Sequence, residues 1–338
     1  MRKKNNMFPC TGIIRILKNL LFIFLFHFLL YSCTEQNNTT ISKDLEISYY
    51  PMKEVSKRMV VRVSCNGSEE EYFMLDSGHA SDLIMLDSAY FYESVNANEL
   101  EPVKQKYRMA FWWSTFYKGK VNVNIAGKSF CIDSAKVEVT TQFQEKNRYR
   151  YPRILGLLGV DAFLDKITIL NFKENLIGFT DMLNTDFDIN NFIVVDLVQA
   201  RTITETNKDY NYRFISIDGF KTTDGNKKKG LFLLDTGCST DLVMKSSFGK
   251  DLKYEKQESR KSGFTYGAYE WVWRSDTLIL GDGFKTNNIE VSVCKLPPDQ
   301  DKLEILAGGD GVIGLSFLKR FDMVIFDFIN NKLYLKIV

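Results

Sequence analysis

The chain carries one thirteen-residue pattern twice, and this repeat limits the folds that are open to it. Residues 73–85 read FMLDSGHASDLIM, and residues 232–244 read FLLDTGCSTDLVM. A second pair of short segments, GLLG at residues 156–159 and GVIG at residues 311–314, follows the two copies at similar distances. Two motifs that recur in the same order indicate two copies of one folding unit. The length of 338 residues fits about two such units, with a boundary near residue 185.

Each copy reads as a β-rich lobe. Apolar and β-branched residues at 59–65, an Asn-Gly turn and a return run at 71–75 predict a hairpin that leads into Asp-Ser-Gly. In the second copy we expect strands at 212–217 and 231–234 around a longer loop at 218–229. Further strands are predicted at 120–125, 135–140, 167–172, 277–280, 289–294, 323–328 and 332–337.

Few helices are expected. The best candidates follow Gly159 and Gly314, at residues 162–164 and 317–319. Elsewhere, apolar and polar residues alternate, and Gly or Asn residues punctuate the runs throughout both copies. The predicted class is therefore all-β with minor helix.

The N-terminus reads as an export signal. A basic stretch precedes the mostly apolar residues 20–31, which match a signal-peptide core and are too few to span a bilayer. The sequence LYSC at 30–33 resembles a bacterial lipobox, although Tyr31 stands where a small residue is usual. The resemblance implies a signal peptide at 1–32, a lipid on Cys33, and attachment to the bacterial cell envelope, where we expect the outer membrane. An ordinary secretory signal or a short anchor is the alternative.

The rest of the chain divides into a tether and two lobes. Residues 33–44 are polar and have too little apolar surface to fold, so we expect a flexible tether there. The first lobe is expected at 45–185 and the second at 186–338. Because both lobes belong to one chain, we expect a monomer.

The charge of the body argues against nucleic-acid binding. The chain has 44 basic and 42 acidic residues, and residues 1–32 hold five of the basic ones and none of the acidic ones. Removal of that segment leaves a net charge of −3 and no block of Lys or Arg. Such a body offers no electrostatic surface for a phosphate backbone.

Histidine and cysteine content limits metal and disulfide chemistry. The two histidines are His27, which lies in the leader, and His79, so a His-rich metal site is excluded. Four cysteines besides Cys33 remain after export. The sequence leaves open whether they form disulfides or stay free as small buried side chains. They are Cys65, Cys131, Cys238 and Cys294.

An apolar strand that runs into Asp-Ser/Thr-Gly and is followed by a hydrophobic-hydrophobic-Gly segment resembles the aspartic peptidases of the pepsin and retropepsin type. Retropepsins pair two copies of one such unit as a homodimer, whereas pepsin-like enzymes fuse two units. The repeat therefore implies two tandem retropepsin-like acid-protease lobes in a bilobal, pepsin-like arrangement. A single such tripeptide would be an ordinary tight turn, since Asp, Ser and Gly all favour turns.

The resemblance implies a role for each motif residue. Asp76 and Asp235 are the implied catalytic pair, and Ser77 and Thr236 are the implied bridges between the two turns. Glycines complete the supporting set, two of them in the turns and two in the segments that pack beneath the turns: Gly78, Gly237, Gly159 and Gly314. A glycine beside a carboxylate lets a neighbouring backbone approach closely.

The implied chemistry is peptide hydrolysis by an activated water. Two carboxylates a few ångströms apart cannot both ionise, so their pKa values separate and the pair shares one proton. The ionised member takes a proton from water while the protonated member donates to the scissile carbonyl. We therefore expect an aspartic endopeptidase that acts on extended peptide or protein substrates, without a metal or an organic cofactor.

Two residues depart from the family pattern. His79 follows the first turn glycine, where Ser or Ala is usual, and a cationic imidazole there would lower the pKa values of the aspartates. A neutral, hydrogen-bonded histidine is the simpler interpretation. Cys238 holds the equivalent place in the second copy and reads as a small packed side chain. A Cys/His hydrolase is the other interpretation of these two residues.

Aromatic residues between the two motifs of each copy fit a flap that closes over a substrate. The candidates are Trp112, Trp113 and Tyr117 in the first copy and Tyr266 and Trp271 in the second. All four tryptophans of the chain lie in these two regions, which fits a cleft that excludes water. Ordinary hairpin packing is the alternative, since aromatic residues favour strands.

Three functions compete for this sequence. The first is the envelope peptidase, and the second is a catalytically silent lipoprotein that binds peptides or proteins on the same fold. The third is a structural envelope component, which gives no reason for two aligned Asp-Ser/Thr-Gly turns. The sequence does not separate the first two, because the effect of His79 decides between them.

Overall fold

The computed structural model describes most of the chain after residue 39. The described residues are 40–42, 47–55, 57–79, 83–109, 112–141, 143, 153–183, 189–199, 212–253, 258–261, 269–275, 277–281, 283–294 and 309–337. Residues Thr39–Val338 form one compact unit. The predicted signal peptide and Cys33 lie outside the described residues. Within those residues, no helix has the length and apolar character needed to cross a membrane.

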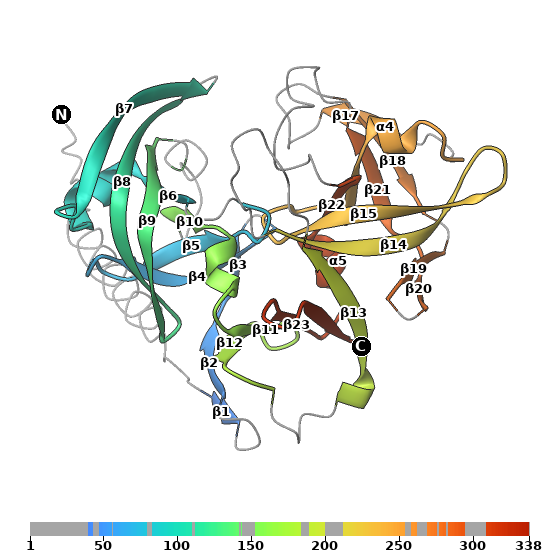
Figure 1. The fold of residues 1–338 in the computed structure, drawn as a ribbon, viewed down its shortest axis with the longest axis horizontal. Helices are drawn as coiled ribbons and strands as arrows, with labels where there is room; N and C mark the ends of the chain where they lie inside the picture. Colours follow the sequence, from blue (N-terminus) through green and yellow to red (C-terminus); the bar gives the residue numbers. More distant parts are fainter. Residues whose placement is uncertain are drawn as a thin grey trace, which may run out of the picture. The chain divides into compact units, whose positions relative to one another are not determined.

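Strands dominate the described residues and form two sheets (Figure 1). The smaller sheet has eight strands in the order β3-β4-β5-β10-β6-β9-β8-β7. Their bounds are β3 Lys53–Val55, β4 Arg58–Cys65, β5 Glu71–Leu75, β10 Gly156–Leu158, β6 Leu83–Asp87, β9 Lys128–Thr140, β8 Trp112–Ile125 and β7 Leu100–Met109. This sheet carries the first Asp-Ser-Gly turn at the end of β5.

The larger sheet has sixteen strands, fourteen of them in the order β1-β2-β12-β11-β23-β24-β13-β14-β15-β22-β16-β21-β18-β17, while β19 pairs with β14 and β20. The first seven along this order are β1 Thr40–Ser42, β2 Ile47–Pro51, β12 Leu176–Thr180, β11 Ile167–Asn171, β23 Met323–Asp327, β24 Lys332–Lys336 and β13 Phe192–Gln199. The others are β14 Arg213–Lys221, β15 Lys227–Asp235, β22 Gly311–Gly314, β16 Leu242–Lys245, β21 Glu290–Cys294, β18 Tyr269–Arg274, β17 Glu258–Lys261, β19 Leu278–Leu280 and β20 Phe284–Thr286.

The two copies of the repeat have the same local topology. β10 lies between β5, with which it is parallel, and β6, with which it is antiparallel. In the second copy, β22 lies in the same way between β15 and β16. Each hydrophobic-hydrophobic-Gly segment is thus the strand between the one that enters the Asp-Ser/Thr-Gly turn and the one that leaves it. The expected all-β fold with two acid-protease lobes is confirmed.

Strands from both copies also share the larger sheet. β11 pairs antiparallel with β23, with Ile169 opposite Ile325, and both side chains are fully buried. Hydrogen bonds therefore join strands on either side of residue 185, and the division into lobes at that residue stays a prediction.

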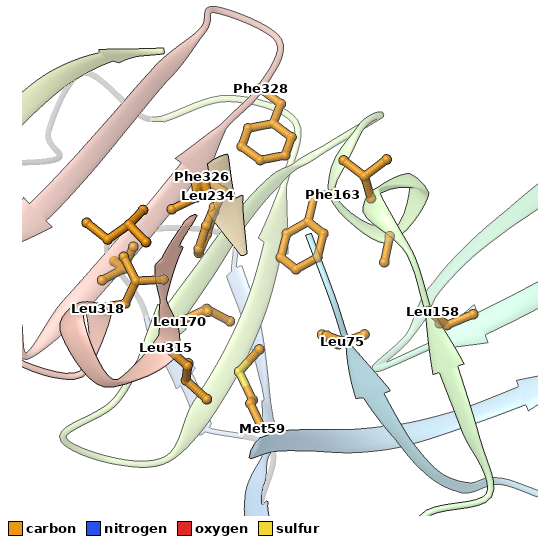
Figure 2. Close-up of a cluster of buried hydrophobic side chains, with 14 of the residues drawn as sticks. Met59, Leu75, Leu158, Phe163, Leu170, Leu234, Leu315, Leu318, Phe326 and Phe328 are labelled. Carbon is orange, nitrogen blue, oxygen red and sulfur yellow. The ribbon is translucent and has the colours of Figure 1, made fainter. Parts of the chain in front are cut away.

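One buried cluster contains side chains from both copies of the repeat (Figure 2). Phe163 contacts the rings of Phe326 and Phe328, with centroids 5.2 and 6.0 Å apart. Leu75 and Leu234, which directly precede the two aspartates, belong to the same cluster. Each side chain of this size contributes roughly 1.5–3 kcal/mol when it is fully buried. The strand ends that carry the aspartates are therefore fixed from below by shared apolar packing.

Two expected helices are confirmed and one expected loop is wrong. The 3₁₀-helix η1 (Val160–Phe163) and the helix α5 (Leu315–Leu318) follow Gly159 and Gly314. The loop predicted at 218–229 is shorter, because β14 continues to Lys221 and β15 begins at Lys227. Gly219, at φ +97°, accommodates an irregularity in the β14–β15 pairing that lets the strands continue.

The sequence interpretation missed two helices, α2 (Ser88–Ser94) and α4 (Ser246–Gly249), each of which follows the strand after a repeat motif. The side chain of Asp87 caps α2 by accepting hydrogen bonds from the backbone N–H groups of Ala89 and Tyr90. Asp followed by Ser before an aromatic run was the signal for this helix start. A third short element, η2 (Ile189–Asn191), is a 3₁₀-helix before β13.

Candidate active site

Reciprocal hydrogen bonds join the two Asp-Ser/Thr-Gly turns. The N–H of Ser77 donates to Oγ1 of Thr236 at 3.0 Å, and the N–H of Thr236 donates to Oγ of Ser77 at 3.1 Å. Each hydroxyl then donates across to the strand of the other copy, Ser77 to the carbonyl of Leu234 and Thr236 to that of Leu75, both at 2.9 Å. All four bonds are buried, so they hold the turns in one relative position.

Each turn glycine lies against the aspartate of the other copy. A Cβ atom on Gly78 would lie 2.5 Å from Cγ of Asp235, and a Cβ on Gly237 would overlap the carboxylate of Asp76. The N–H groups of the same glycines bind the carboxylates of their own turns. Gly78 donates to Oδ1 of Asp76 at 3.0 Å, and Gly237 donates to Oδ1 of Asp235 at 2.8 Å. The two carboxyl groups thereby face each other across the turns.

The two carboxyl groups differ in proton affinity. Burial, followed by the negative charge of Asp76 and the hydrogen bond between the pair, raises the pKa of Asp235 well above its usual range. Burial also raises the pKa of Asp76, but its hydrogen bonds with Asp235 and with Gly78 N–H favour the ionised form. A pair this close shares one proton, and its two pKa values belong to the pair as a whole.

The strands and short helices beneath the turns support them. The N–H of Asp76 donates to the carbonyl of Leu158 at 2.9 Å, and the N–H of Leu315 donates to the carbonyl of Cys238 at 2.7 Å. Gly314 packs so closely that a Cβ atom on it would lie 2.6 Å from the carbonyl oxygen of Cys238. Gly159 is buried and accepts a hydrogen bond from Ala162 at the start of η1.

The fold of this chain resembles that of solved structures. The aspartic proteinase of Irpex lacteus superposes with a TM-score of 0.50 at 12% identity, over 86% of this chain and 97% of that one. This is the pepsin-like aspartic-proteinase fold. The basic 7S globulin of soybean matches 86% of this chain and 94% of its own, at 9% identity and a TM-score of 0.46. No family model and no curated protein matches the chain.

His79 occupies a distinctive place in this pepsin-like fold. Its N–H donates to the carbonyl of Asp76 at 3.1 Å, and its own carbonyl accepts from Val160 N–H at 3.3 Å. The ring nitrogen Nε2 is buried and has no hydrogen-bond partner among the described residues. Burial lowers the pKa of His79, while the charges of Glu138 and Asp235 act in the opposite direction. The imidazole is therefore neutral at pH 7, although Nε2 lacks the hydrogen bond that the sequence interpretation expected.

Cys238 is a packed thiol rather than a nucleophile. It is buried, and its Sγ lies 3.1 Å from Oγ1 of Thr240. Burial and then the charge of Asp235 raise the pKa of the thiol to about 12. The thiolate needed for a Cys/His hydrolase is therefore scarce near neutral pH. Cys65 and Cys131 are also free, the first buried and the second exposed, and the side chain of Cys294 lies outside what the structure describes.

The predicted flap aromatics that the structure describes lie in two different strands, β8 and β18. Trp112 and Trp113 lie near the end of the β7–β8 hairpin, where their backbones pair with Met109 and Arg108. The backbone of Trp271 lies in β18 between β17 and β21. The side chains of these three tryptophans and the whole of Tyr266 fall outside the described part of the chain.

Tyr117 has the contacts of ordinary hairpin packing. Its ring centroid lies 4.8 Å from that of Phe91 in α2, and its hydroxyl lies 3.2 Å from the hydroxyl of Tyr92. Because side chains alternate along β8, Tyr117 projects from the face opposite that of Ser114 and Phe116. These contacts favour the packing alternative for Tyr117.

The sequence interpretation missed Glu138, the acidic residue that acts on His79. Glu138 lies in β9 opposite Phe116, and its Oε1 accepts a hydrogen bond of 2.6 Å from Oγ of the buried Ser114. Burial lowers the pKa of His79, and the negative charge of Glu138 opposes that effect. No sequence signal pointed to Glu138, because it comes near the repeat motif only through the pairing of β9 with β6, where Glu138 lies opposite Met85.

Replacement of Thr236 by valine is expected to destabilise the fold. Valine keeps the shape of threonine but removes Oγ1, so the buried N–H of Ser77 and carbonyl of Leu75 lose their partner. An unpaired buried group costs about 1–3 kcal/mol, so we expect the free energy of unfolding to fall by roughly 2–4 kcal/mol in urea titrations. Thr236→Ser is the matched control, since it retains the hydroxyl. Equal losses in both variants would contradict this role for the hydroxyl.

Proposed function

We propose that this protein is an aspartic endopeptidase that hydrolyses extended polypeptides with Asp76 and Asp235. One observation carries the proposal: buried reciprocal hydrogen bonds between the two turns hold two carboxyl groups face to face. Buried carboxyl pairs that share a proton are suited to simultaneous acid and base catalysis. The pepsin-like fold supports the same assignment.

The proposed mechanism uses the two protonation states of the pair. Ionised Asp76 takes a proton from a bound water as the water oxygen forms a bond to the scissile carbonyl carbon. Asp235 donates its proton to the carbonyl oxygen, which gives a neutral tetrahedral diol. Proton transfer from Asp76 to the amide nitrogen then accompanies cleavage of the C–N bond, and Asp235 recovers its proton from a hydroxyl of the diol. The water is activated by a carboxylate, so the scheme requires no metal.

The reaction is proposed to take place at the cell envelope. The lipobox-like sequence at 30–33 supports lipid attachment at Cys33 and export of the body. Mass spectrometry of the mature N-terminus tests this part separately. A lipid-modified Cys33 is the expected result, and an unmodified terminus would indicate an ordinary secretory signal.

Peptide cleavage is the direct test of the proposed activity. We expect residues 39–338 to cleave an unbiased peptide library at a pH between about 4 and 7.5, wherever the carboxyl pair holds one proton. Mass spectrometry of the products identifies the cleaved bonds and the sequence preference. A folded protein that cleaves nothing across this range would instead support the peptide-binding alternative. Measurement of the equilibrium binding of the same library would then test that alternative.

The raised pKa of Asp235 predicts a stabilising active-site substitution. A carboxyl with a higher pKa in the folded state stabilises the protein below its unfolded pKa and loses this contribution as pH rises through the folded value. Asp235→Asn removes the ionisable group, so we expect a higher Tm than that of the wild type near pH 7. The difference should shrink as both proteins are acidified towards about pH 4, where aspartate protonates in the unfolded chain.

A second aspartate provides the control for this experiment. Hydrogen bonds from Thr222 and Asn226 lower the pKa of the exposed Asp224, so its effect on stability has the opposite sign. Asp224→Asn should therefore leave the Tm at pH 7 unchanged or slightly reduced. Thermal unfolding measured from pH 3 to pH 8 compares the two variants. A lower Tm for Asp235→Asn at pH 7 would contradict the assignment of a raised pKa.

A further inference from the structure

The unpartnered nitrogen of His79 lies beside the proposed catalytic pair. In the part of the chain that the structure describes, Nε2 is buried without a hydrogen-bond partner, whereas most buried polar atoms in folded proteins have one. Both backbone hydrogen bonds of the residue are made, to Asp76 and from Val160, so the residue is fixed in the turn. A lone buried nitrogen on a fixed residue costs stability unless something binds to it.

The groups around the imidazole are acidic. The charges of Glu138 and Asp235 both act on it, and Asp76 lies three residues before it in the same turn. Glu138 already accepts the hydrogen bond from Ser114. Within the described residues none of these carboxyl groups is bonded to Nε2, so the buried nitrogen stays unpaired until another molecule reaches it.

We propose that His79 is a substrate-positioning residue whose Nε2 forms a hydrogen bond with the polypeptide bound at Asp76 and Asp235. This inference rests on the proposed function, in that it places a peptide at the pair. A neutral imidazole has one N–H donor and one lone-pair acceptor. An extended peptide presents backbone N–H and C=O groups in alternation, so its main chain can satisfy either form of the ring nitrogen. The expected contact is therefore with the main chain of the substrate, whatever its side chains.

His79 can be observed directly without any substitution. It is the sole histidine of residues 39–338, so ¹⁵N-histidine labelling gives one imidazole to follow by NMR. The probe is a peptide whose scissile amide is replaced by a non-hydrolysable hydroxyethylene group. We expect the Nε2 resonance to shift as this peptide saturates the protein. The inference would be overturned if a peptide binds while the Nε2 resonance stays where it is in the free protein. It would also be overturned if no such peptide binds.

Kinetics of variants provide the second measurement. His79→Phe keeps a ring but removes Nε2, and we expect KM to rise about threefold to tenfold, the usual worth of one hydrogen bond, with kcat changed much less. His79→Gln restores a polar group and should recover part of the loss. Cys131→Ser is the control, because the thiol of Cys131 is exposed in β9, outside the two turns, and this variant should leave KM unchanged. An unaltered KM in His79→Phe would contradict the proposal.

The two measurements distinguish this inference from the proposed function. If the protein binds the probe and Nε2 shifts, but no peptide is cleaved, then His79 positions a ligand and the peptidase assignment fails. A different outcome is that peptides are cleaved, that KM is the same in His79→Phe as in the wild type, and that the Nε2 resonance does not shift when the probe binds. The peptidase assignment then stands and the inference about His79 fails.

Discussion

Asp76→Asn and Asp235→Asn are each expected to abolish peptide hydrolysis without unfolding the protein. Asparagine has the shape of aspartate and keeps an oxygen for the glycine N–H groups that bind each carboxylate. It neither accepts a proton from water nor donates one to a carbonyl at these pH values. Loss of one acid–base partner should lower kcat by on the order of 10³-fold, measured by mass spectrometry on a cleaved peptide.

The controls for this prediction separate chemistry from folding. Asp310→Asn is isosteric and lies beside β22, where Asp310 accepts a hydrogen bond from Leu231 N–H at 2.9 Å, so cleavage should continue in that variant. The double variant of Asp76 and Asp235 should be no worse than either single one, because the two groups act as a unit. Cleavage that survives in either single variant would show that another group activates the water.

The repeat in the sequence predicted the parts of the site that are local to each copy. Ser77 and Thr236 lie at matching positions of two turns, so a symmetric pair of hydrogen bonds between them follows once the two turns meet. The short helices after Gly159 and Gly314 also follow from the local pattern. The helices depend on neighbouring residues in the chain, which a sequence shows directly, whereas the bridge between Ser77 and Thr236 was expected from the resemblance to aspartic peptidases.

Other features depend on strand pairing, which the sequence did not reveal. Glu138 comes near His79 only because β9 pairs with both β6 and β8. Tyr117 packs on α2 because of its position in the alternation of β8, and α2 was itself missed. Long strands with bulges, such as β8 with its shift between Gly119 and Val121, change which face a residue occupies. The alternation of residues in the sequence therefore does not show which face of the sheet a residue occupies beyond such a shift.

Gly237→Ala is expected to reduce catalysis strongly by forcing the two carboxyl groups apart. The φ angle of Gly237 lies outside the left-handed region, so alanine is allowed there by the backbone, but its Cβ would overlap the carboxylate of Asp76. Asp76 must then move away from Asp235, and their hydrogen bond is lost. A displacement of about 1 Å in a reacting group can cost 10²-fold, so we expect a loss of kcat on the order of a hundredfold.

The pH dependence of the same variant tests the cause of that loss. Part of the rise in the pKa of Asp235 comes from the charge of Asp76, so separation of the pair should lower it. Activity needs Asp235 protonated, and the alkaline limb of the pH–rate profile should therefore move to lower pH.

Gly225→Ala is the control, because Gly225 has φ +86° but no atom lies within 4 Å of the place that its Cβ would occupy. That variant should lose some stability through backbone strain, roughly 1 kcal/mol, and retain both kcat and the position of the limb. Equal kinetic effects in the two variants would mean that any added methyl group slows the enzyme, and that the close contact between Gly237 and Asp76 is not what keeps the carboxyl pair together.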